Sequence, residues 1–174
     1  MKDASKIRRL IVPVRAISGG KSIVTYAMLD GGATNPVIRE EVVEALGMKS
    51  EEKESTLVTV GVTAQGVRRF SQLEVANLGG DVVLNVKEAL IMDILTTEYD
   101  KPPTNEEVKG EAYLEGVTFD ELEDKSVNMI LPMEFGWCWL GGKVRRSMID
   151  KPIALNTEFG WALAGHYQII RPIG

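Results

Sequence analysis

The sequence predicts a single, mainly β domain that contains one or two short helices. Short apolar runs rich in valine, isoleucine and leucine recur along the chain, separated by turns that contain glycine, which is typical of β structure. The clearest helix pattern is confined to residues 35–47. The chain has 174 residues, 44% of them hydrophobic, which suits one compact domain with a substantial core.

Charge and composition exclude several classes of function. The net charge of −5 gives no electrostatic support for nucleic-acid binding. The acidity is concentrated between Glu98 and Lys125, where ten acidic residues stand against three lysines. One cysteine, Cys138, allows no internal disulfide and, with one histidine, His166, argues against a metal site or a cysteine–histidine nucleophile pair. No apolar run is long enough to span a membrane and no secretory signal is present, so we expect a soluble chain without membrane, metal or cofactor.

The N-terminal part predicts two strands, residues 10–17 and 22–29, joined by a turn at residues 18–21. Pro13 lies within the first and predicts either an edge strand or a backbone position directed away from the ladder. Gly20-Lys21-Ser22 imitates the end of a phosphate-binding loop. The glycine required five residues earlier is replaced by Arg15, and β-type sequence follows, so we expect no nucleotide site.

The second predicted strand delivers one carboxylate, Asp30, into a run of small residues. These residues are Gly31, Gly32, Ala33 and Thr34. An Asp-Gly pair alone is a common turn, but this run resembles the Asp-Thr/Ser-Gly-Ala active-site loop of retropepsin-type aspartic peptidases. Such enzymes hold two carboxylates about 3 Å apart, so that one acts as base and the other as acid. The loop does not recur after Asp30, so an active enzyme of this kind would be a symmetric homodimer.

The segment after the loop predicts a short amphipathic helix and then a hairpin. Asn35 and Pro36 predict the helix start and Gly47 its end. Residues 56–60 and 67–70 predict two strands around a glycine-bounded connection. An ordinary hairpin is one interpretation; the other is a flap that closes over a bound peptide and excludes water. The predicted flap residues are Gly61, Val62, Thr63, Ala64, Gln65 and Gly66.

Beyond the hairpin, the sequence predicts further strands at residues 73–76, 82–94 and 159–164. The acidic residues 98–125 predict a long, mobile surface excursion with a short helix near Phe119–Leu122. Residues 127–135 return to core-like sequence, and the basic cluster at residues 143–146 is most simply a solvated face.

Three segments together resemble the peptidase domains of BEL/Pao-type retrotransposon polyproteins. Residues 152–165 are similar to the Pro-x-Ala-x-x-Thr-x-x-Gly-Trp-x-x-x-Gly ending of those domains, and residues 127–135 to their Ile-Asp-Leu-Leu-Ile-Gly-x-Asp-Tyr segment. Asp30–Ala33 resembles their Asp-Ser-Gly loop. Two positions depart from the family pattern. Gly31 replaces the hydroxyl residue that braces two active-site loops across the dimer axis, and Pro132 replaces a glycine beneath the loop.

The resemblance implies a small, closed barrel of about six strands that works as a homodimer in the cytoplasm or within virus-like particles. It implies an N-terminal extension (1–9), a peptidase domain (10–165) and a tail toward the next polyprotein segment (166–174). Asp30 of each subunit would form the catalytic dyad of an endopeptidase that processes its own polyprotein, with Gly32 donating hydrogen bonds to it. The substrate would be an extended peptide. The alternatives are a weak or inactive dimerisation or peptide-binding module with the same fold, and a purely structural polyprotein segment.

Overall fold

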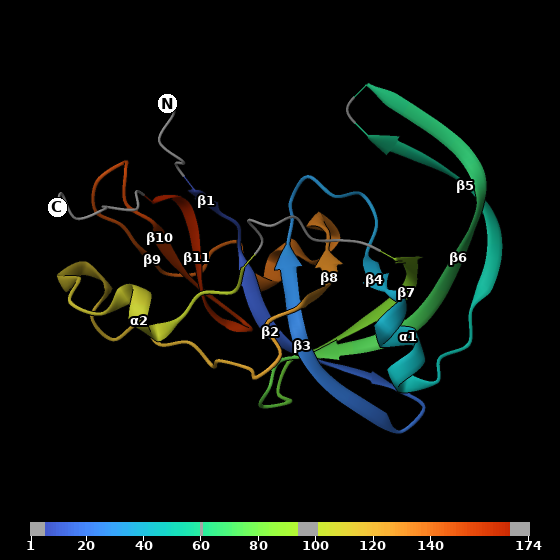
Figure 1. Ribbon diagram of the computed structural model, residues 1–174, viewed down its shortest axis with the longest axis horizontal. Coiled ribbons are helices and arrows are strands. Elements are labelled where there is room, and N and C mark those ends of the chain that lie inside the picture. Colours follow the sequence, from blue (N-terminus) through green and yellow to red (C-terminus); the bar gives the residue numbers. More distant parts are fainter. Residues whose placement is uncertain (1–5, 60, 94–100, 168–174) are drawn as a thin grey trace, which may run out of the picture.

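The computed structural model describes residues 6–59, 61–93 and 101–167, and Figure 1 shows their arrangement. The strands are β1 (Lys6–Arg8), β2 (Ile11–Ser18), β3 (Lys21–Leu29), β4 (Val37–Arg39), β5 (Glu51–Thr59), β6 (Val62–Ala76), β7 (Val83–Met92), β8 (Val127–Leu131), β9 (Val144–Arg145), β10 (Ile153–Thr157) and β11 (Gly160–Tyr167). The helices are α1 (Glu40–Leu46), α2 (Asn105–Val108) and the 3-10 helices η1 (Ala112–Leu114) and η2 (Met133–Cys138).

Six strands close into a small barrel in the order β2-β3-β8-β4-β7-β6. The barrel closes because residues 15–17 of β2 pair with residues 74–76 of β6. β3 runs parallel to β8 and β4 runs parallel to β7, whereas the other described neighbours are antiparallel. The prediction of a mainly β, closed barrel with few short helices is confirmed.

Alternate side chains of the strands fill the barrel interior. Val12, Val14 and Ala16 of β2 are fully buried and pack with residues of β3, β6 and β8. β2 also pairs on both sides, so it is not an edge strand, and Pro13 lies outside the part paired with β6. The structure therefore agrees with the interpretation that the Pro13 backbone nitrogen is directed away from the ladder, and not with an edge strand.

The predicted helix begins four residues later than expected. Val37–Arg39 forms strand β4, which lies between β7 and β8, so tertiary pairing overrides the helix pattern of this stretch. Helix α1 then carries Glu40 and Glu41 in its first turn. Gly47 ends it in the left-handed conformation, with φ of 59°, as predicted.

The hairpin is longer and its turn tighter than predicted. β5 and β6 pair continuously from Glu51↔Phe70 to Thr59↔Val62, so residues 62–66 belong to β6 and the expected six-residue connection is wrong. Gly61 lies in the turn with φ of 81°, which suits glycine. The hairpin projects from the barrel on the same side as the loop that follows β3 (Figure 1).

The acidic excursion is packed against a second, four-stranded sheet of order β1-β11-β10-β9. Val108, Leu114, Val117 and Phe119 are buried there with Ala154 and Leu163. The helix predicted near residues 119–122 is wrong, and α2 and η1 lie earlier in the segment. Asn105 supplies the physical reason: its side chain accepts from the Phe119 N–H at 2.7 Å and donates to the Phe119 carbonyl at 2.9 Å, which satisfies the backbone without a helix.

The two chain ends of the described part pair with one another. Ile7 lies opposite His166 and Arg8 opposite Gly165, so parts of the predicted N-terminal extension and C-terminal tail share one sheet. Arg8 also forms an ion pair with Glu107. Residues 1–5, 60, 94–100 and 168–174, on which parts of the predicted termini, hairpin and excursion fall, lie outside the described residues. None of the helices in the described ranges is long and apolar enough to cross a membrane.

Gly142 is expected to be essential for the junction of the barrel with the small sheet. A Cβ at this position would overlap the carbonyl oxygen of Asn156, while the adjacent Lys143 carbonyl accepts the Asn156 N–H at 2.8 Å. We predict that Gly142→Ala lowers the free energy of unfolding by about 1–3 kcal/mol, measured by denaturant titration. Gly66→Ala is the matched control, because its Cβ would lie at an ordinary 3.6 Å from Arg68. Equal stability of the two variants would contradict this packing.

Candidate functional site

Asp30 lies at the end of β3, where two neighbouring strands fix its backbone. The Leu29 N–H donates to the Leu10 carbonyl at 2.8 Å, and the Asp30 N–H donates to the Leu131 carbonyl at 2.9 Å. Ala27, Met28 and Leu29 are buried ahead of it. The carboxylate is therefore carried by a rigid strand end and not by a free loop.

The carboxylate itself is half-buried and is oriented by its own loop. The Gly32 N–H donates to Asp30 Oδ1 at 2.9 Å, and the Ala33 N–H donates to the Asp30 carbonyl at 3.2 Å. Gly31, Gly32 and Thr34 are exposed. The five residues named from the sequence thus form one compact turn that presents a carboxylate at the surface with a backbone donor behind it, the arrangement that a shared-proton carboxylate pair requires from each half.

One side of Gly31 lies against the Met133 side chain, which sequence analysis did not single out. A Cβ at Gly31 would lie 2.8 Å from the Met133 Cε atom. Met133 follows Pro132, which is buried and stands just beyond the last paired residue of β8, so the proline removes no ladder hydrogen bond of that strand. The departure at Pro132 is thus accommodated, and the Asp30 backbone still bonds to Leu131.

The hairpin β5–β6 is an arm anchored at its base. Arg69 pairs with Glu40 of α1 at 2.7 Å, and Lys53 pairs with Glu88 of β7 at 2.5 Å. Closer to the turn, the Arg68 guanidinium donates to the carbonyls of Ser55 at 2.7 Å and of Gly66 and Ala64 at 3.3 Å. This single side chain cross-links the two strands. Sequence analysis missed these ion pairs because their partners lie 29 and 35 residues away.

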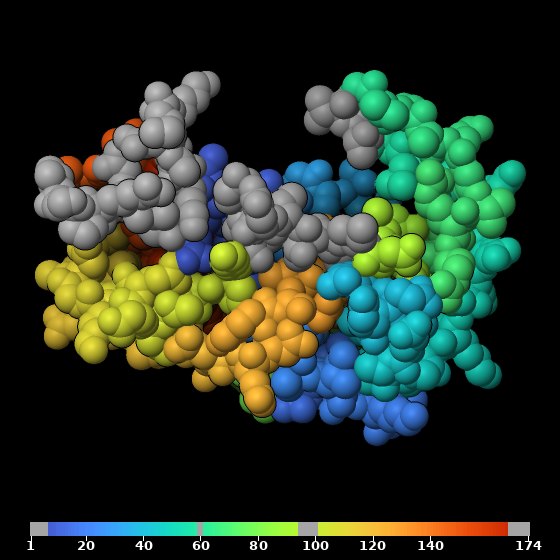
Figure 2. Space-filling model, viewed as in Figure 1, coloured from blue at the N-terminus to red at the C-terminus, as the bar shows by residue number. Residues whose placement is uncertain are grey.

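The predicted flap residues lie at the far end of this arm. Gly61 is in the turn and Val62–Gly66 continues along β6. Val58 and Val67, on the two strands, are each more than half exposed, so the arm presents apolar side chains to its surroundings. Figure 2 shows the hairpin standing out from the rest of the molecule at the upper right of the view.

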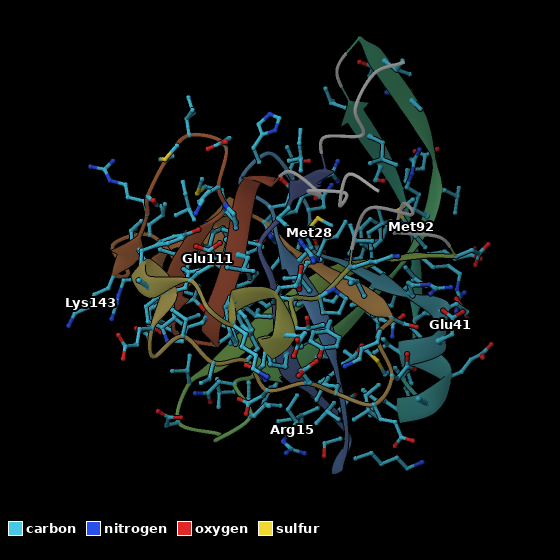
Figure 3. The ribbon with its side chains drawn as sticks, turned by 60° about the vertical axis from the view of Figure 1, so that its left-hand side comes forward. Arg15, Met28, Glu41, Met92, Glu111 and Lys143 are labelled. Atoms are coloured by element: carbon cyan, nitrogen blue, oxygen red, sulfur yellow. The ribbon has the colours of Figure 1, made fainter. Side chains whose placement is uncertain are left out.

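The end of β3 lies between the hairpin side and the small-sheet side of the molecule. In Figure 3, Met92 and Glu41 mark the hairpin side and Glu111 and Lys143 the small-sheet side, with Met28 between them. A hollow next to Asp30 is lined by Arg9, Leu10, Met28, Leu29 and Ala164. Three larger hollows lie elsewhere: one at the hairpin base beside Glu40 and Arg69, one near Ser18 and Leu46, and one lined by residues between 105 and 118. They contain no residue of the Asp30 loop.

Other chemistries find little support in the described residues. No group of three or more His, Cys, Asp or Glu side chains in them is placed to hold a metal ion. Cys138 is buried in the barrel core, and burial together with the Glu158 carboxylate raises the pKa of its thiol to about 11. At neutral pH it is a protonated core side chain and not a nucleophile.

Comparison of the chain with models of known protein families, with curated proteins and with solved structures finds no match.

The raised pKa of Cys138 makes a direct prediction. The native thiol is expected to react with iodoacetamide at pH 8 about a hundredfold or more slowly than the same thiol in concentrated guanidinium chloride, because only the thiolate reacts and burial suppresses it. The measurement is the rate of mass gain under the two conditions. Similar rates in the native and unfolded chain would show that Cys138 is accessible and ionised.

Proposed function

We propose that the chain is one subunit of a homodimeric aspartic endopeptidase of retropepsin type. The observation that carries the proposal is the Asp30 turn, in which a rigid strand end presents a carboxylate whose Oδ1 accepts the Gly32 N–H at 2.9 Å. One such turn is half of an aspartic peptidase site, and a two-fold axis beside Asp30 would supply the other half.

The mechanism follows from two carboxylates that share one proton. The charged carboxylate takes a proton from a water held between the two Asp30 side chains, and that water attacks the peptide carbonyl carbon. The protonated carboxylate donates a hydrogen bond to the carbonyl oxygen as negative charge develops there. The tetrahedral intermediate then collapses with cleavage of the C–N bond, and the leaving amine takes a proton from one Asp30 carboxyl group, which restores the singly protonated pair. The Gly32 N–H donates to Asp30 Oδ1 and keeps its carboxylate in place. No metal or cofactor takes part in these steps.

The hairpin supports an extended peptide as the substrate. It lies on the same side of the barrel as the Asp30 loop (Figure 1) and is fixed at its base while its end projects. An extended peptide held between hairpin and loop would gain main-chain hydrogen bonds as an added strand and bury Val58 or Val67. The resemblance to BEL/Pao-type domains makes the chain's own polyprotein the proposed substrate.

A second candidate is a dimerisation or peptide-binding module with little or no activity. It is favoured by one specific observation: position 31 carries no hydroxyl, and Met133 occupies the space next to it. Self-cleavage of a longer precursor separates the two functions, because only the peptidase processes it.

Substitution of Asp30 tests the proposed peptidase. We predict that Asp30→Asn lowers cleavage of a precursor by at least about a thousandfold, since the amide cannot act as base. The unfolding midpoint is expected to stay unchanged, because the amide oxygen still accepts the Gly32 N–H. Asp120→Asn, an exposed position on the packed excursion, is the control and is expected to cleave normally. Wild-type cleavage by Asp30→Asn would eliminate the aspartic peptidase.

The pH dependence gives a second test. Two coupled carboxylates are active in the singly protonated form, so kcat/KM is expected to follow a bell with its maximum on the acid side of neutrality. The profile is measured with a short peptide that contains the cleavage site. A rate that climbs steadily into the alkaline range would instead indicate a different base or nucleophile.

A further inference from the structure

Helix η2 and the turn that follows it carry exposed apolar side chains on the surface beside the Asp30 loop. Met133, Trp137 and Leu140 have exposed fractions of 46%, 59% and 60%, and we call these three residues the η2 patch. Met133 and Leu140 lie together over buried Gly136. A Cβ on that glycine would lie 2.7 Å from the Met133 Sδ atom and 3.2 Å from the Leu140 Cδ1 atom. Adjacent exposed side chains of this size on a soluble domain mark an interaction surface.

The η2 patch is continuous with the Asp30 loop. The Met133 methyl group lies 2.8 Å from the Cβ position of Gly31, which directly follows Asp30. The two segments meet because β3 and β8 are parallel neighbours, with Leu29 opposite Leu131. Parallel strands end at the same edge of a sheet, so the residues after each strand emerge side by side.

This continuity has a geometric consequence if the proposed dimer is correct. A dyad requires two Asp30 carboxylates about 3 Å apart, so the adjoining Gly31 of each copy must lie close to the two-fold axis. A side chain in contact with Gly31 then lies at the same interface. An arrangement of two chains that joins their Asp30 carboxylates therefore brings both Met133 side chains close to the interface.

We propose that Met133 is a dimer-forming residue that packs against the second copy of this chain beside Gly31. The inference rests on the proposed function and extends it. The two Met133 side chains hold the subunits together by apolar contact. A hydroxyl group at position 31 would do so by hydrogen bonds across the interface. A flexible, unbranched side chain suits this position because it can adapt to its symmetry mate. Leu140 lies beside Met133 over Gly136, and Trp137 of the same helix is 59% exposed.

The test is the monomer–dimer equilibrium, measured by sedimentation equilibrium over a range of protein concentrations. Met133→Glu places a charge in each half of the interface and is expected to raise the dissociation constant at least about tenfold, and Met133→Ala in the same direction by less. Met148→Glu is the matched control, because Met148 is 63% exposed and lies outside the η2 patch. It is expected to leave the dissociation constant unchanged. Cleavage by Met133→Ala is expected to fall at low enzyme concentration and to recover at high concentration.

A double variant sharpens the assignment. The Gly31→Ser variant requires the Met133 methyl group to move, so by itself it is expected to raise the dimer dissociation constant or leave it unchanged. The double variant Gly31→Ser, Met133→Ala is expected to have a lower dissociation constant than Met133→Ala alone, because the methyl group is no longer there. A wild-type chain that stays monomeric at every concentration, or a dimer that Met133→Glu and Met133→Ala leave intact, overturns the proposal. So does equal weakening by Met148→Glu. A dimer that needs Met133 but cleaves without Asp30 would leave this inference standing and remove the peptidase instead.

Discussion

The parallel pairing of β3 with β8 is the constraint on which the candidate site depends. It sets Leu29 opposite Leu131 and lets the Asp30 N–H donate to the Leu131 carbonyl at 2.9 Å. Because parallel strands finish at one edge, the Asp30 turn and helix η2 start from adjacent points, although about a hundred residues separate them in the chain. This single pairing fixes the start of the Asp30 turn, where the Gly32 N–H donates to the carboxylate, and it places the Met133 side chain next to Gly31.

The barrel holds the Asp30 turn rigidly, whereas the hairpin extends away from the barrel. The buried C-terminal half of β3 and its neighbour β8 hold the Asp30 turn. The hairpin, in contrast, is attached at its base through Arg69–Glu40 and Lys53–Glu88, and its far end projects. These ion pairs are partly exposed, so each contributes little to stability, and their value lies in setting the direction of the arm. A fixed carboxylate below a projecting arm is an arrangement suited to closing over an extended chain.

Sequence reasoning found what depends on local pattern and missed what depends on distant pairing. Strands β2, β3, β6 and β7 of the barrel, the turn after Leu29 and the end of α1 at Gly47 follow from apolar runs and glycine signals in the sequence. Val37–Arg39 carried a helix pattern but became β4, because two distant strands offered it hydrogen bonds. Likewise the acidic segment has the composition of a surface excursion, yet Val108 and Phe119 pack against the small sheet. No local sequence pattern predicts that this sheet lies next to them. Met133 next to Gly31 could not be foreseen without the β3–β8 register.

The central claim is that two copies of Asp30 form one site, and mixing two chains tests it most directly. Wild-type chain is combined with Asp30→Asn chain at constant total concentration, and cleavage is measured as the wild-type fraction falls. If both carboxylates are required and subunits exchange freely, activity follows the square of the wild-type fraction, so that an equal mixture retains about a quarter of it. Activity directly proportional to the wild-type fraction would contradict the account, because each chain would then act alone.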